Sequence, residues 1–299
     1  MDLNYLVNAL FRRTPWTLRL LVFVVLATTG FLAASLRPAG ATEPAPQRYL
    51  DKVFDRATVT KDVRYAPTPA GSAVDRLGDV YEPEGDTAAR RPAVVWLHGS
   101  GADKAGVVEN YVGTMFARHG AVAVSIDYRA RAFRTDGSYD NLPVEDASAA
   151  LAWLRAHADE YRVDPNRIVL AGASAGGMAA LDTAYLGHDD GLAAVLSIVG
   201  TGPEDGARGD GPPTLMINGD ADQIVRLERA TRFCDEVNQA GGSCTLQSFP
   251  SGHPIYGFAT EIEQVVSDWF WRTLDFGSLT GTPGPVSYTH LTLPTNREV

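Results

Sequence analysis

The middle of the chain carries alternating blocks of two kinds of apolar pattern. Short runs that are apolar at nearly every position, such as Ala93–Leu97, are typical of strands buried on both faces of a parallel sheet. Longer segments such as Val144–Asp159 have apolar residues at three- and four-residue spacing, which predicts helices with one buried face. The alternation predicts an α/β fold with a mostly parallel central sheet flanked by helices.

The same patterns give the bounds of each predicted element. We expect strands over Thr58–Tyr65, Arg76–Tyr81, Ala93–Leu97, Ala121–Ile126, Arg167–Ala171, Ala193–Val199, Thr214–Asn218 and Thr245–Phe249. We expect helices over Glu109–Arg118, Val144–Asp159, Gly176–Leu186, Leu227–Ala240 and Gly257–Leu274. The Gly- and Pro-rich stretch Thr201–Pro213 is too short for a large cap domain, so we expect an open site.

Both ends of the chain differ from its middle. Residues 1–41 hold an apolar run, Leu20–Leu36, that follows basic residues and precedes Ala39-Gly40-Ala41, a pattern typical of a secretory signal peptide. An uncleaved membrane anchor is the alternative, because the run is long for a signal. We expect a linker over 42–57, a folded catalytic domain over 58–276 and a non-native or disordered tail over 277–299. Within that tail, residues 286–295 resemble a translated sequencing adapter.

The charge of the chain narrows the classes of partner. It has 36 acidic residues against 26 Lys and Arg, a formal net charge of -10, without a basic stripe. Nucleic-acid binding needs clustered Lys and Arg opposite the phosphates. We therefore expect no nucleic-acid partner.

The only two cysteines are Cys234 and Cys244. Export would place them in an oxidising compartment, where such pairs form disulfides. Cys234 falls late in a predicted helix and Cys244 just before a predicted strand, so we expect a disulfide that ties this helix to the edge of the sheet. Two buried thiols are the alternative, because the sequence does not show distances in space.

A candidate nucleophile follows one of the predicted buried strands. Gly172-Ala173-Ser174-Ala175-Gly176 lies between that strand and an Ala-rich helix, the setting of a nucleophile elbow. The two flanking glycines keep side chains out of a crowded turn. A serine hydroxyl is a weak nucleophile, so Ser174 also needs a base to accept its proton.

The base and the acid are expected at the same edge of the sheet. His253 directly follows the last predicted strand, whereas His119 and His157 lie near helix ends, where a solvated imidazole is ordinary. A carboxylate must orient that imidazole. Asp220 and Asp222 both follow the preceding strand, and we favour Asp222 because the loop has to turn before a side chain can point toward His253. Asp220 would then be a turn former or a cap.

The oxyanion of a tetrahedral intermediate needs main-chain donors. One is expected from Ala175, the residue after the nucleophile, and a second from the turn after Ala93–Leu97. Ser100 and Gly101 are the candidates in that turn, because small residues let the main chain approach a substrate. The alternative is that this turn is only a tight connection between a strand and a helix and supplies no donor.

Four motifs together resemble the α/β-hydrolase superfamily, in particular its secreted serine carboxylesterase and dienelactone-hydrolase-like branches. They are HGSG at 98–101, GASAGG at 172–177, NGDAD at 218–222 and SGH at 251–253, and the resemblance covers roughly 65–274. HGSG is similar to the HGGG loop of hormone-sensitive-lipase-like esterases, although Ser100 replaces a glycine and Ala173 replaces a usually acidic residue. Dienelactone hydrolases use a cysteine nucleophile where this chain has Ser174. The resemblance implies ester hydrolysis through an acyl-enzyme, with no metal and no organic cofactor.

The function favoured by the sequence is a secreted or membrane-anchored serine carboxylesterase that acts on small or mid-sized acyl esters. A peptidase or lipase on the same fold is an alternative. A non-catalytic binding module is another, although such modules typically lack the nucleophile or the base. The substrate stays open between small-molecule and polymer-attached esters, including acetylated sugars, aryl esters, lactones and polyesters.

Overall fold

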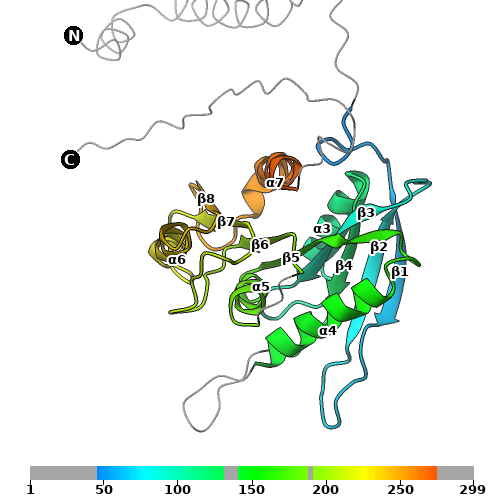
Figure 1. The fold of residues 1–299 in the computed structure, drawn as a ribbon, viewed down its shortest axis with the longest axis horizontal. Coiled ribbons are helices and arrows are strands. Elements are labelled where there is room, and N and C mark those ends of the chain that lie inside the picture. The colour runs from blue at the N-terminus through cyan, green and yellow to red at the C-terminus, as the bar shows by residue number, and fades with distance from the viewer. Residues whose placement is uncertain (1–45, 131–140, 188–190, 275–299) are drawn as a thin grey trace, which may run out of the picture. The chain divides into compact units, whose positions relative to one another are not determined.

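The computed structural model describes residues 46–130, 141–187 and 191–274, which form an eight-stranded sheet with helices on both faces (Figure 1). The predicted signal peptide or anchor at 1–41 and the predicted tail at 277–299 lie outside the described residues. Within the described ranges, no helix has both the length and the apolar content needed to cross a bilayer.

The sheet is mostly parallel. Its strands are β1 (Ala57–Arg64), β2 (Leu77–Pro83), β3 (Arg91–Leu97), β4 (Val122–Ile126), β5 (Val163–Ala173), β6 (Ala194–Ile198), β7 (Thr214–Gly219) and β8 (Cys244–Phe249). Their order across the sheet is β1-β2-β4-β3-β5-β6-β7-β8. Among these strands, only β2 has the opposite direction, and it pairs antiparallel with both β1 and β4. All the other pairs are parallel. This arrangement confirms the predicted fold class, and the segment 199–213 between β6 and β7 holds no large cap.

The helices cover the sheet in two layers. They are α3 (Val107–Arg118), α4 (Leu142–Ala156), α5 (Ala175–Tyr185), α6 (Leu227–Gln239) and α7 (Ala259–Thr273), with a short 3-10 helix η1 (Tyr256–Phe258). On one face, α4, α5 and α6 share a core cluster with Val95 and Leu97 of β3; on the other, α3 and α7 share a second cluster with Val94 and Trp96. Consecutive strand residues point to opposite faces, so every residue of β3 is buried.

The central strand β5 is longer than its sequence predicts. Its first residues, Asp164-Pro165-Asn166, are polar and at least partly exposed, so they carry no apolar signal. Val163 nevertheless pairs with Arg91 of β3, beyond an irregularity in the ladder. The hydrogen-bonded ladder therefore continues where the hydrophobic pattern has already ended.

Part of the expected linker packs against the domain. In the segment 46–56, Tyr49 is buried and its N–H donates to the carbonyl of His119 at the end of α3. The N–H groups of Val53 and Phe54 both donate to the carbonyl of Arg118. From residue 46 onward the chain therefore lies against the domain instead of leading freely into it.

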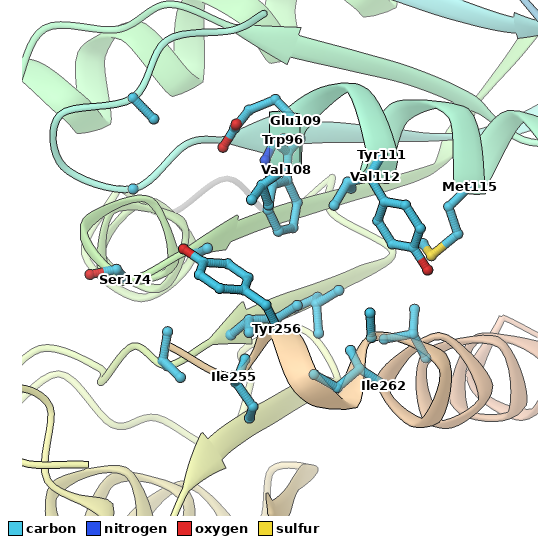
Figure 2. Close-up of a pocket in the computed structure, with 18 of the residues that line it drawn as sticks. Trp96, Val108, Glu109, Tyr111, Val112, Met115, Ser174, Ile255, Tyr256 and Ile262 are labelled. Carbon is cyan, nitrogen blue, oxygen red and sulfur yellow. The ribbon is translucent and has the colours of Figure 1, made fainter. Parts of the chain in front are cut away.

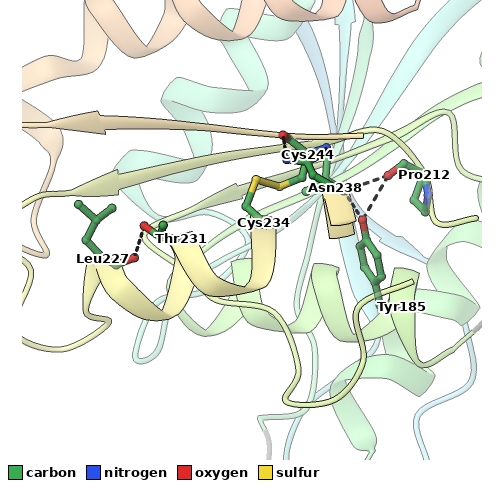
Figure 3. The surroundings of a disulfide bond; sticks show 8 residues. Tyr185, Pro212, Leu227, Thr231, Cys234, Asn238 and Cys244 are labelled. Carbon is green, nitrogen blue, oxygen red and sulfur yellow. Dashed lines mark hydrogen bonds between the residues drawn. A yellow bond between two sulfur atoms is a disulfide. The ribbon is translucent and has the colours of Figure 1, made fainter. Parts of the chain in front are cut away.

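A disulfide joins α6 to the edge strand β8, as the sequence predicts (Figure 3). Cys234 and Cys244 have their Cα atoms 5.2 Å apart. The side-chain amide of Asn238 also pairs with the main chain of Cys244, donating to its carbonyl at 2.9 Å and accepting from its N–H at 2.8 Å. The edge strand is thus held to α6 by a covalent bond and by two hydrogen bonds.

Candidate active site

Ser174 lies at the apex of the turn between β5 and α5. Its backbone has φ 53° and ψ -117°, a conformation that residues other than glycine rarely adopt. A Cβ on Gly172 would lie 2.4 Å from the carbonyl carbon of Gly176, and one on Gly176 would lie 2.1 Å from the carbonyl oxygen of Leu97. Both glycines are therefore needed for the turn to pack against the end of β3.

His253 lies between β8 and η1 and contacts Ser174 across the edge of the sheet. The Ser174 Oγ is 2.9 Å from the His253 Nε2. The imidazole is mostly enclosed, with 17% of the side chain exposed. A hydroxyl and an imidazole nitrogen at this distance can exchange a proton directly.

Asp222 completes a chain of three side chains. Its Oδ2 is 2.7 Å from the His253 Nδ1, and its Oδ1 accepts hydrogen bonds from the N–H groups of Ile224 and Val225 at 2.8 and 2.9 Å. Asp222 is 3% exposed, whereas Asp220 lies on the surface. With Nδ1–H donated to the carboxylate, Nε2 is left as the acceptor for the hydroxyl proton of Ser174.

The loops that carry Asp222 and His253 are held together by their main chains. The N–H of Ala221 donates to the carbonyl of Ser251 at 3.0 Å. A Cβ on Gly219 would lie 2.3 Å from that same carbonyl oxygen, so only glycine allows this approach. The glycine that ends β7 therefore helps to fix Asp222 and His253 relative to each other.

The loop after β3 lies beside Ser174. A Cβ on Gly99 would be 3.6 Å from the Cβ of Ser174. The loop is fixed by the hydroxyl of Tyr128, which donates to the carbonyl of His98 at 2.7 Å, and by Asp127, whose Oδ1 accepts from the N–H of Lys104 at 2.8 Å. Both anchors come from the segment that follows β4.

The candidate oxyanion donors differ in their placement. Ala175 is the first residue of α5, where N–H groups have no acceptor within the helix. Ser100 lines the cavity beside Ser174, and so does Gly99, which the sequence analysis does not name. Gly101 has φ 79° and is not among the lining residues. The geometry therefore favours Gly99 and Ser100 over Gly101 as the part of this loop nearest the nucleophile.

A cavity of about 200 Å³ opens beside Ser174, between α3 and α7 (Figure 2). Much of its wall is apolar. These lining residues are Trp96, Val108, Val112, Met115, Phe116, Leu196, Ile198, Val199, Ile255, Ile262 and Val266. Ser174 lies at one end of the view, and Tyr111 and Met115 lie at the other.

Two carboxylates also line this cavity. Glu109, in the first turn of α3, is 3% exposed and has no hydrogen-bond or ion-pair partner among the described residues. Glu263 on α7 contacts the Lys52 Nζ at 2.6 Å and the His119 Nε2 at 2.9 Å, and it accepts from the Tyr111 hydroxyl at 3.0 Å. Burial alone would raise the pKa of Glu263, but these hydrogen bonds outweigh it and hold the pKa below its usual value.

Sequence reasoning did not find the cavity. Its apolar lining comes from α3, α7, three strands and the loops between them, and most of these side chains have the pattern of ordinary core residues. The lining residue Val199 has φ 47°, a strained conformation for a β-branched residue, and this mark of an unusual site is visible only in the structure. In the described ranges, no group of three or more His, Cys, Asp and Glu side chains is placed to hold a metal ion.

Solved structures with the same architecture are esterases. A thermophilic esterase from Thermogutta terrifontis superposes with a TM-score of 0.59 at 24% identity, over 74% of this chain and 93% of that one. A truncated carbohydrate esterase from gut microbiota gives a TM-score of 0.60 at 20% identity, over 73% and 96%. The chain has the α/β-hydrolase fold.

Parts of the sequence are also similar to a family model and to hydrolases. Residues 78–201 match the family model BD-FAE, a range that includes Ser174. Phenmedipham hydrolase of Pseudarthrobacter oxydans is 38% identical over 90 residues, covering 29% of this chain and 18% of its own length. Esterase LipC of Mycobacterium tuberculosis is 26% identical over 202 residues, covering 51% and 48%. The chain thus spans less than half the length of these curated relatives.

Proposed function

We propose that the protein is a serine carboxylic-ester hydrolase that works through Ser174, His253 and Asp222 and forms an acyl-enzyme. The observation that carries the proposal is the continuous contact from the Ser174 Oγ to His253 at 2.9 Å and from His253 to Asp222 at 2.7 Å. The substrate is a small-molecule or polymer-attached ester. Relatives named esterases and the shared fold support this class of reaction.

In the first half of the reaction, the Ser174 Oγ attacks the ester carbonyl carbon while its proton moves to the His253 Nε2. The carbonyl oxygen then carries a negative charge. Asp222 stabilises the imidazolium that has formed, and its own carboxylate is fixed by two main-chain N–H groups. When the intermediate collapses, the bond to the alcohol oxygen breaks and His253 returns the proton to the leaving alcohol.

The negative oxygen needs donors that are in place before the reaction begins. The N–H of Ala175 points out of the first turn of α5, where the helix dipole also favours negative charge. The loop of Gly99 and Ser100 supplies the second donor in this proposal, and the anchors from Tyr128 and Asp127 keep that loop in place.

In the second half, water attacks the acyl-enzyme. His253 takes a proton from the water as its oxygen bonds to the acyl carbon, and the bond to the Ser174 Oγ then breaks. The proton passes to Ser174, and the carboxylic acid leaves. Atoms and charges balance with water as the only co-reactant, so the described residues supply every proton transfer in the cycle.

Replacing the nucleophile tests the proposal. The protein should hydrolyse 4-nitrophenyl butyrate, and Ser174→Ala should lower kcat by about 10⁶, because the three side chains act as one unit. Release of 4-nitrophenolate gives the rate, and mass spectrometry of the quenched protein should show the acyl group only when Ser174 is present. Equal turnover by the variant would refute the assignment.

An exported enzyme is the setting we propose for this activity. The disulfide between Cys234 and Cys244 supports an extracytoplasmic location, because such bonds persist in oxidising compartments. The segment 1–41 is proposed to direct export, either as a signal peptide or as an anchor. N-terminal sequencing of the exported protein would distinguish the two.

A further inference from the structure

The cavity between α3 and α7 gives the proposed hydrolase a specific substrate class. We propose that it holds the acyl group and selects uncharged apolar acyl chains of about four to eight carbons. The inference rests on the proposed function, because the acyl chain is the part that becomes attached to the Ser174 Oγ. The length limit, the apolar wall and the lining acids are three separate observations.

The wall suits methylene groups. Trp96 is 1% exposed, Phe116 4% and Met115 8%, so a chain laid against them leaves water almost completely. Each methylene group transferred into such a site improves binding by about three- to fourfold. The benefit ends where the cavity ends, so the dependence on chain length should have a maximum.

The helix α3 gives the length. Glu109 and Met115 both line the cavity and are six residues apart, which is about 9 Å along the axis of a helix. An extended chain of single bonds advances about 1.2 Å per bond, as the polypeptide backbone does, so about seven bonds fit this span. Met115 lies at the end away from Ser174, where it would meet the terminal methyl group (Figure 2).

The lining acids exclude negatively charged chains. Glu109 and Glu263 both face the cavity, and the lining holds no Lys or Arg among the described residues. Lys52 and His119 contact Glu263, but neither contacts Glu109. A terminal carboxylate on the acyl chain would therefore enter a poorly solvated site whose lining offers it no Lys or Arg.

The acyl group fits this cavity better than the alcohol does. The alcohol has to leave before water attacks, whereas the acyl chain stays through both half-reactions. A cavity enclosed by α3, α7 and the sheet suits the group that remains, and the alcohol can depart on the solvent side. A series of alcohols with one fixed acyl group makes this assignment testable.

The first test measures kcat/KM for 4-nitrophenyl esters from acetate to dodecanoate. The unchanged protein should be most active between butyrate and octanoate, and Met115→Phe should move the maximum at least two carbons shorter. Val112→Phe lies one turn nearer Ser174 and provides a second shortening variant. The matched control is Met216→Ala, a fully buried methionine on the opposite face of the sheet, which should leave the maximum where it is.

The second test compares 4-nitrophenyl hexanoate with the mono-4-nitrophenyl ester of adipic acid, which adds a terminal carboxylate to a six-carbon chain. The unchanged protein should have a kcat/KM for the adipate ester at least about tenfold below that for hexanoate, because the cavity offers the buried carboxylate no Lys or Arg. Equal kcat/KM values for the two esters would overturn the selection of uncharged chains.

The outcomes separate the two proposals. If the esters are hydrolysed but the chain length of highest kcat/KM is unchanged in both Met115→Phe and Val112→Phe, the acyl cavity is overturned. The proposed serine hydrolase is not affected by that result. The acyl cavity is also overturned if these variants change the preferred length of the alcohol, measured with one fixed acyl group, and not that of the acyl chain. No Ser174-dependent hydrolysis of any ester overturns the proposed function and, with it, this inference.

Discussion

At the residue scale, Asp222 is distinguished from Asp220 by its contacts. One oxygen of Asp222 accepts from two main-chain N–H groups, which leaves the other free to face His253. Asp220 is on the surface, although its own N–H donates to the carbonyl of Phe249. Two aspartates that are two residues apart therefore have different surroundings, because the loop turns between them.

Exchanging each aspartate for asparagine should give unequal results. Asp222→Asn should lower kcat by about 10⁴, because the amide no longer favours the imidazole tautomer that accepts the Ser174 proton. Asp220→Asn should change kcat by no more than a few fold. Ester hydrolysis measures both, and unchanged melting temperatures would show that the fold is intact. A severe loss with Asp220→Asn alone would contradict the proposed role of Asp222.

The sequence could predict these residues because each one follows a predicted strand. In a parallel sheet, strand ends gather at one edge, so Ser174, Asp222 and His253 could be nominated without any distance. Glu109 and Met115 could not, since their role depends on α7 packing opposite α3. An acid in the first turn of a helix has an ordinary explanation as a partner of the helix dipole.

At the element scale, the tie between α6 and β8 stabilises the edge of the sheet nearest the base. The strand β8 pairs with a single neighbour, β7, and the loop after it carries His253. The disulfide closes a short loop, so it removes conformations mainly from the unfolded chain.

Replacing Cys234 and Cys244 together by Ala should lower the free energy of unfolding by about 2 to 3 kcal/mol, from the length of the loop that they close. Thermal unfolding followed by circular dichroism measures this loss. Dithiothreitol should lower the melting temperature of the unchanged protein and have no effect on the variant. Equal stability of the two proteins would show that the bridge adds nothing to the folded state.

Most elements were predictable, but their ends were not. Apolar runs gave the cores of the strands, while β5 continues through the polar residues Asp164-Pro165-Asn166 to Val163, which pairs with Arg91 of β3. The segment 46–56 has neither helical nor strand periodicity, so its packing on α3 could not be predicted. Hydrogen bonds to carbonyls at a helix end leave no trace in a hydrophobic pattern.

At the scale of the whole domain, Glu263 joins three parts of the chain. Lys52 belongs to the segment before β1, Tyr111 to α3 and His119 to the end of α3, while Glu263 itself lies on α7. The carboxylate accepts from all of them only when it is ionised. Its lowered pKa means that folding favours this ionised form.

This linkage predicts how stability depends on pH. An acid whose pKa is lowered by folding contributes stability above its unfolded pKa and loses that contribution as the pH falls through the folded value. The melting temperature should therefore fall below about pH 4.5, the ordinary value for Glu263. Glu263→Gln should be less stable at pH 7 and approach the unchanged protein at pH 3.5.

The control for this prediction is Glu261→Gln, which removes an exposed acid from the first turn of the same helix. It should be close to the unchanged protein at both pH values. If Glu263→Gln and Glu261→Gln had the same pH profile, the contacts of Glu263 would not be a source of acid sensitivity.

The division of the proposed catalytic residues along the chain has one more consequence. Ser174 precedes the segment 199–213, while Asp222 and His253 follow it, and the two parts meet through the pairing of β6 with β7. Neither part alone contains both a nucleophile and a base. A protein cut within this segment would yield two inactive fragments, and the proposed hydrolysis would return only as they reassociate. The chain could then serve as a reporter for split-protein complementation.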